Sequence, residues 1–187
     1  MKKLFFITAA IFGAGLVIQS CGDSDNQWNE YEDWRKANNA WYAEMEAKTN
    51  PDGTPYYSLV QPAWYPESRL LIHYFNDRSQ TEGNLQPLIT SQVTVKYKGH
   101  LYDGYGFDST TVASDSVRTF LLAETIVGWQ VALTQMHVGD TCEIIVPYTM
   151  GYGYLGNTSS TGAVTIPPYS ALRFNIGLKD IPAYEIP

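Results

Sequence analysis

Residues 93–110 read VTVKYKGHLYDGYGFDST, and this stretch decides the fold class. Its start, VTVKYK, alternates between apolar and polar side chains, which is typical of a strand with one face in the core and one in water. Asp103-Gly104 follows as a turn, because glycine adopts backbone conformations that other residues avoid. The stretch therefore predicts a strand of an antiparallel sheet that ends in a loop.

Further strands are predicted on both sides of this segment. The same alternation returns at 142–146 (CEIIV) and 172–179 (LRFNIGLK). Two short β-rich runs, 56–60 (YYSLV) and 70–74 (LLIHY), come earlier and are separated by Pro62 and Pro66. One short helical pattern, 124–136, carries its apolar side chains on one face: Trp129, Ala132, Leu133 and Met136. These elements predict an α+β fold, with an antiparallel sheet curled around a single helix.

A longer helical pattern covers residues 26–48, and NPDG at 50–53 ends it. Its large apolar side chains recur at helical spacings: Trp28, Tyr31, Trp34, Trp41, Tyr42 and Met45. This surface must be covered, so the helix packs on the body of the protein, closes one end of it, or binds a partner. Its acidic side chains are expected on the solvated face: Glu30, Glu32, Asp33, Glu44 and Glu46.

The chain begins with Met1-Lys2-Lys3, an almost wholly apolar run at 4–18, and Gln19-Ser20-Cys21. A transmembrane helix needs about 20 apolar residues, and the run is shorter than that. Its basic start and the small residue before its end fit an export signal. The array resembles a bacterial lipoprotein leader, which implies removal of residues 1–20 and acyl chains on Cys21. An ordinary secretory leader with an incidental cysteine is the alternative.

This resemblance implies a cell-envelope protein held to a membrane through Cys21, with the outer membrane as the first expectation. We predict three parts: a signal peptide at 1–20, a tether and aromatic helix at 21–55, and one folded domain at 56–187. The tether is the polar segment GDSDN at 22–26. With Cys21 acylated, Cys142 has no disulfide partner, so we expect it to be a small buried hydrophobe.

The charge balance is acidic, with 12 Lys and Arg against 19 Asp and Glu and a net charge of −7. The basic residues do not cluster along the sequence in the way that tracking phosphates requires. We therefore expect no nucleic-acid partner.

Several motifs for other chemistries fail. Residues 151–156 (GYGYLG) match the G-x-G-x-x-G pattern, but a dinucleotide site also needs a following helix and an acidic residue about 20 positions later. A Ser, Thr and Gly loop follows instead. His73, His100 and His137 lack zinc-ligand spacing, and no serine or cysteine has the surroundings of a nucleophile. The sequence predicts no metal site and no cofactor.

The segment from Val93 to Ile181 resembles the FKBP-type peptidyl-prolyl cis-trans isomerases. Four ordered motifs carry the resemblance: VTVKYKGHLYDGYGFDST at 93–110, ETIVGWQVALTQMHVGD at 124–140, IIVPYTMGYG at 144–153 and IPPYSALRFNIGLKDI at 166–181. The family's fold is a bent antiparallel sheet around a short helix, which the alternation above predicts independently.

The resemblance also implies a substrate pocket. Trp129 would form its floor, and Asp108 and Tyr152 would supply polar groups, so these three are the expected catalytic residues. The expected substrate-binding walls are Tyr97, Phe107, Ile126, Ile166 and Phe174. The alternative for the aromatic residues is that they fill a core.

The implied activity is rotation of X-Pro bonds in proline-containing exported polypeptides, a step slow enough to limit folding. Two features leave open a binding module or chaperone with the same fold and no useful turnover. Arg118 stands where the family usually has an aromatic residue, and the loop 154–165 is long and rich in Ser, Thr and Gly. The sequence predicts no oligomeric state.

Overall fold

The computed structural model describes residues 23–110 and 116–182, and the leader and Cys21 lie outside them. The chain divides into two compact units between Glu30 and Tyr31. The described part of the first unit is helix α1 (Asp23–Glu30). The polar segment predicted as a tether is thus helical from Asp23 onward, and its role as a tether stays a prediction.

The predicted helix 26–48 is divided into two helices, α1 and α2 (Glu32–Ala47), with a turn at Tyr31. The carbonyl of Tyr31 accepts a hydrogen bond from the N–H of Arg35, so this residue starts α2 without being helical itself. The second unit contains α2 and the rest of the described chain.

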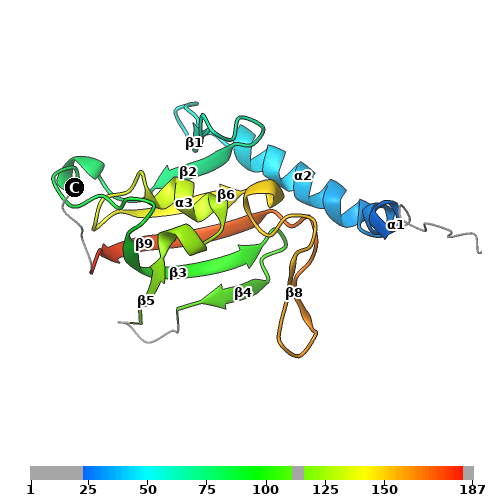
Figure 1. Cartoon of the computed structure of the whole chain (residues 1–187). Coiled ribbons are helices and arrows are strands. Elements are labelled where there is room, and N and C mark those ends of the chain that lie inside the picture. The colour runs from blue at the N-terminus through cyan, green and yellow to red at the C-terminus, as the bar shows by residue number, and fades with distance from the viewer. Residues whose placement is uncertain (1–22, 111–115, 183–187) are drawn as a thin grey trace, which may run out of the picture. The chain divides into compact units, whose positions relative to one another are not determined.

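One antiparallel sheet forms the body of the second unit (Figure 1). Its strands are β1 (Ser58–Val60), β2 (Leu70–Tyr74), β3 (Gln92–Leu101), β4 (Gly106–Ser109), β5 (Arg118–Leu121), β6 (Thr141–Val146) and β9 (Leu172–Asp180). Their order is β1-β2-β6-β9-β3-β4, and β5 also pairs with β3. The three alternating segments of the sequence are therefore the neighbouring strands β6, β9 and β3, as an antiparallel sheet requires.

Helix α3 (Val127–Leu133) covers the inner face of this sheet and is shorter than the predicted 124–136. A 3₁₀ turn, Leu122–Glu124, precedes it and occupies the start of the predicted range. Gly128 allows the close approach, because a Cβ there would lie 2.5 Å from Cγ1 of Val146. The helix and the inner strand faces share one core that includes Leu70, Val95, Leu133, Ile144, Leu172 and Ile176.

Cys142 lies in this core with a fully buried side chain. Burial raises the pKa of its thiol to about 12, so the group stays protonated. Its Sγ lies 3.6 Å from Sδ of Met136. The prediction of a small buried hydrophobe is confirmed.

Helix α2 packs on the outer face of the sheet, the face that α3 does not cover. Its Trp41, Tyr42 and Met45 contact a small cluster formed by Tyr57, Leu71 and Ile145. Toward the start of α2, Nε1 of Trp34 donates to Oγ of Ser170 over 3.1 Å. Of the alternatives for the aromatic helix, packing on the body is therefore the one observed for α2.

Asn38 gives α2 a specific polar attachment. Its side chain is 1% exposed, and its Oδ1 accepts a hydrogen bond from the N–H of Ala171 at 2.8 Å. Its Nδ2 donates to the carbonyl of Trp34, also at 2.8 Å. The predicted solvated acids Glu32, Asp33 and Glu44 are exposed, whereas Glu46 is partly buried and pairs with Arg69.

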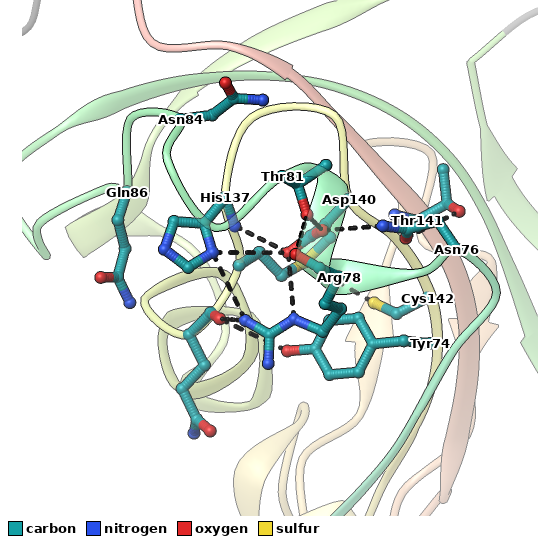
Figure 2. Close-up of polar contacts among 12 residues, drawn as sticks. Tyr74, Asn76, Arg78, Thr81, Asn84, Gln86, His137, Asp140, Thr141 and Cys142 are labelled. Carbon is teal, nitrogen blue, oxygen red and sulfur yellow. Dashed lines mark hydrogen bonds and ion pairs between the residues drawn. The ribbon is translucent and has the colours of Figure 1, made fainter.

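The turn between α3 and β6 is held by Asp140, whose side chain is fully buried (Figure 2). Its carboxylate accepts hydrogen bonds from Oγ1 of Thr81, Nδ2 of Asn76 and the N–H of His137, and Nε of Arg78 lies 3.4 Å away. Burial acts to raise the pKa of Asp140, but these partners together hold it below its ordinary value. Asp140 thereby ties the segment 76–81 to the end of the helix.

The long loop 154–165 contains a small hairpin of β7 (Asn157–Thr158) and β8 (Val164–Ile166), which extends away from the sheet in Figure 1. Strand β7, and not a helix, directly follows residues 151–156. Among the described residues, no helix is both long and apolar enough to cross a membrane.

Candidate active site

A cavity of about 230 Å³ opens between the start of α3 and the inner face of the sheet. Its lining comes from six parts of the chain: β3, β4, β5, the segment 124–129, Tyr152 and β9. The lining residues are Tyr97, Phe107, Asp108, Phe120, Glu124, Thr125, Ile126, Trp129, Tyr152 and Phe174. The sheet and the helix thus bring together side chains that lie far apart in the sequence.

Trp129 is the centre of the aromatic part of this cavity. Its side chain is 5% exposed, and three rings meet it edge to face, with centroid distances of 5.0 Å to Tyr97, 5.6 Å to Phe120 and 5.4 Å to Phe174. Such edge-to-face pairs are a favoured arrangement of aromatic quadrupoles. The indole is therefore held rigidly, as a platform for an apolar ligand has to be.

Glycine at position 99 makes room for two more rings of the wall. Phe107 packs edge to face on Phe174 with a centroid distance of 5.5 Å. A Cβ on Gly99 would lie 2.7 Å from Cζ of Phe107 and 2.9 Å from Cε1 of Phe174. Any larger residue at position 99 would displace one of these rings from the cavity wall.

Polar groups gather on one side of the cavity. The hydroxyl of Tyr97 donates to Oδ2 of Asp108 at 2.5 Å, and Nη1 of Arg118 donates to the Tyr97 hydroxyl at 3.1 Å and to Oδ1 of Asp108 at 3.3 Å. Burial, with the neighbouring Asp108 carboxylate, raises the pKa of Tyr97, so its hydroxyl stays protonated. Arg118 and Asp108 are about half exposed, so their ion pair contributes little to stability.

Tyr152 supplies a hydroxyl that is available to a ligand. The side chain is partly buried in the cavity wall, and its hydroxyl has no hydrogen-bond partner within the described residues. Burial and the charge of Asp108 raise the pKa of Tyr152, which keeps the proton in place at neutral pH. The backbone N–H of Ile126 also has no partner within residues 23–110 and 116–182. Both groups can donate to carbonyl oxygens of a bound peptide.

Seven of the eight predicted pocket residues line this one cavity: Tyr97, Phe107, Asp108, Ile126, Trp129, Tyr152 and Phe174. The eighth, Ile166, is not among its lining residues. Ile166 ends β8, pairs with Asn157 and is 2% exposed in the main core. The aromatic side chains belong to the core and the cavity at once, so the two alternatives for them are not exclusive.

Three lining residues were absent from the predicted pocket: Phe120, Glu124 and Thr125. Phe120 follows Arg118 by two positions in β5, and side chains at that spacing share one face of a strand. That spacing was a usable signal for Phe120. Glu124 and Thr125 precede α3 without regular periodicity, and only the fold brings them to the cavity.

Comparisons with known proteins agree with this geometry. The family model described as "FKBP-type peptidyl-prolyl cis-trans isomerase" matches residues 83–179, just over half of the chain. The "FKBP-type 22 kDa peptidyl-prolyl cis-trans isomerase" of Escherichia coli is 40% identical over 115 residues, which are 62% of this chain and 51% of that protein. The "Outer membrane protein MIP" of Legionella longbeachae is 43% identical over 93 residues, which are 50% of this chain and 37% of that protein.

A solved peptidyl-prolyl cis-trans isomerase structure from Pseudomonas syringae superposes with a TM-score of 0.62 and 25% identity, covering 80% of this chain and 94% of that one. The matched part of this chain spans about half the length of the E. coli relative. The family model covers α3, β3, β6, most of β9 and all of the residues that line the cavity. The chain therefore belongs to the FKBP-type peptidyl-prolyl cis-trans isomerase family.

Proposed function

We propose that the protein catalyses cis-trans isomerisation of X-Pro bonds in polypeptides exported to the cell envelope. The observation that carries this proposal is the cavity over Trp129, an aromatic platform with the hydrogen-bond donors of Tyr152 and Ile126 beside it. Membership of the family supports the reaction type.

The cavity supplies what the rotation needs. A proline ring on the indole of Trp129 is held by burial of apolar surface. The amide resists rotation by about 18 to 20 kcal/mol, because its nitrogen lone pair is delocalised into the carbonyl. Apolar walls that exclude water disfavour this charge-separated form, and so favour the twisted bond.

Hydrogen bonds then fix the peptide on either side of the bond that turns. The hydroxyl of Tyr152 donates to one substrate carbonyl and the N–H of Ile126 to another, so the flanking chain stays in place while the X-Pro bond rotates. Asp108 is held by Tyr97 and Arg118, so its carboxylate has a fixed place on this side of the cavity. No covalent bond to the protein forms or breaks in this scheme.

A membrane anchor at Cys21 completes the proposed setting. The leader at 1–20 supports export and acylation, and the name of the similar Legionella longbeachae protein places that relative in the outer membrane. Labelling cells with a fatty acid tests the anchor. We expect label on the wild-type protein and none on Cys21→Ala, and label that persists on the variant contradicts the assignment.

The cellular role can be tested by refolding. An exported polypeptide whose slow refolding phase comes from an X-Pro bond should refold faster with catalytic amounts of this protein. A binding module without turnover is the second candidate, favoured by the hairpin that exposes Leu155 (69%) and Val164 (56%). Such a module would act only at stoichiometric amounts and would leave the rate of the slow phase unchanged.

A further inference from the structure

The outer face of the sheet carries a cluster of basic side chains that the sequence keeps apart. In β3, Lys96, Lys98 and His100 alternate with the buried residues, so they point away from the core. In β9, Arg173 and Lys179 do the same. The antiparallel register sets Lys96 opposite Gly177, Lys98 opposite Asn175 and His100 opposite Arg173. These five side chains, Lys96, Lys98, His100, Arg173 and Lys179, are called the basic face.

Three cations of this face, Lys98, Arg173 and Lys179, are not neutralised by an ion pair among the described residues. Arg78 and Arg118, by contrast, each have such a partner. Burial lowers the pKa of His100, and the nearby charges of Arg173 and Lys98 lower it further. In a chain with a net charge of −7, this is a local reversal of sign.

Three carboxylates border the basic face: Glu143, Asp180 and, toward the cavity, Asp108, which pairs with Arg118. Glu143 lies opposite Asn175 and accepts a hydrogen bond from the hydroxyl of Tyr57 at 2.5 Å. Asp180 lies opposite Thr94 and accepts one from the N–H of Ile181 at 2.8 Å. Because Asp108 is paired with Arg118, the cations Lys98, Lys179 and Arg173 outnumber the other two carboxylates, and the face attracts anions.

The basic face is linked to the candidate active site by hollows that share lining residues. A hollow of about 270 Å³ around Gly177 is lined by Lys96, Lys98 and Lys179. A second hollow of about 370 Å³ lies along the edge strand β4, from Lys98 and His100 to Phe107 and Asp108. Phe107 and Asp108 also line the active-site cavity. The residues that these hollows share, Phe107 and Asp108 of β4 and Lys98 of β3, are called the path from the cavity to the basic face.

We infer that this path binds the acidic segment of a substrate polypeptide whose X-Pro bond lies in the cavity. Acidic residues near the proline then raise kcat/KM for that substrate. The inference rests on the proposed isomerase function and names a substrate class for it. Neighbouring strands lie about 4.8 Å apart, and an extended chain advances about 3.4 Å per residue. Crossing β4 and β3 to reach β9 thus requires roughly three to six residues beyond the proline.

The test compares peptides with one X-Pro core, a short Gly-Ser spacer and a run of Glu or of Gln, placed before or after the core. At low ionic strength, the wild-type protein should show a roughly fivefold higher kcat/KM for the Glu peptide on one of the two sides. The preference should fall toward one in high salt, because exposed charges are then screened.

Two double variants with the same change in net charge separate this face from general electrostatics. Lys98→Gln/Lys179→Gln should abolish the preference and leave the rate on the Gln peptide unchanged. Lys36→Gln/Lys48→Gln removes two exposed lysines of α2 and its C-terminal end, and it should keep the preference. Equal kcat/KM for Glu and Gln peptides with the wild-type protein, or equal losses in both double variants, would overturn the inference.

Failure of the proposed function gives a different result. If the Gln peptide is not isomerised above background, the function fails, and the inference is then tested by the anisotropy of fluorescently labelled Glu and Gln peptides on the same variants. Binding to vesicles that contain phosphatidylglycerol, an anionic lipid, is measured on the same variants. If Lys98→Gln/Lys179→Gln loses binding to these vesicles while the peptides show no preference, the face is a lipid-binding surface and the inference is wrong.

Discussion

The hydroxyl of Tyr97 donates a 2.5 Å hydrogen bond to Oδ2 of Asp108, and Arg118 contacts both groups. Tyr97 comes from β3, Asp108 from β4 and Arg118 from β5. The arginine stands where the family usually has an aromatic side chain, yet it extends a polar network and leaves the cavity open. The substitution is therefore compatible with a working site.

Replacing Asp108 by Asn should lower the isomerisation rate more than the stability. The change removes the charge that Arg118 and Tyr97 contact, while the shape is nearly conserved. Because the pair is about half exposed, we expect a loss of less than about 1 kcal/mol in unfolding free energy, but a several-fold fall in kcat/KM. Asp33→Asn, which removes an exposed charge on α2, is the control and should change neither.

Tyr152→Phe should slow turnover several-fold without unfolding the domain. The hydroxyl has no partner among the described residues, so its loss leaves no buried group unsatisfied in the free protein. Its hydrogen bond to the substrate is worth about 1 kcal/mol, and 1.36 kcal/mol corresponds to about a tenfold change in rate. Tyr105→Phe removes the hydroxyl of an exposed tyrosine and should have no effect. An unchanged rate in Tyr152→Phe would exclude the proposed donor role.

The sequence predicted the sheet from its alternation, whereas the eight pocket residues were expected from the family resemblance, and seven of them line the cavity. The alternation in 93–98, 142–146 and 172–179 corresponds to β3, β6 and β9, because each strand has one face in the core. Ile166 is not among the lining residues of the cavity, and its side chain packs in the main core. The break between α1 and α2 at Tyr31 was not predicted, because no glycine or proline stands near it in the sequence.

Polar contacts between residues far apart in the chain could not be predicted from the sequence. The link of Asn38 to Ala171 joins residues that only the packing of α2 brings together. The basic face, likewise, depends on the register of β3 with β9. Neither feature has a local pattern in the chain, because hydrogen bonds and charge clusters of this kind follow from tertiary structure.

Asn38→Ala should destabilise the protein, whereas Asn39→Ala should not. Asn38 is buried and accepts the N–H of Ala171, which would be left without a partner at a cost of about 1 to 3 kcal/mol. Asn39 is exposed on the same helix, so its replacement brings the same gain in helix propensity without that loss. Urea unfolding measures both. Equal midpoints would show that α2 is not fastened to the body through Asn38.

The acid sensitivity of the fold should depend on Asp140. Its pKa is lowered in the folded protein, so its contribution is fully present above the unfolded pKa of about 3.9 and is lost as the pH falls through the folded value. Asp140→Asn should cost about 2 kcal/mol or more at pH 7, and should show a weaker decline of melting temperature below about pH 4. Glu82→Gln, an exposed acid in the adjacent segment, should retain the wild-type profile.

The most direct test of the central claim is an isomerisation assay on the protein from Gly22 onward. The cis form of an X-Pro peptide relaxes without catalyst over tens to hundreds of seconds, which leaves ample range for acceleration. We predict a rate that rises linearly with protein concentration and falls several-fold with Tyr152→Phe. Binding of the peptide is measured as a change in tryptophan fluorescence that is absent in Trp129→Phe. If the wild-type protein binds the peptide and yet the rate stays at background, the protein is a binding module and the isomerase account is wrong.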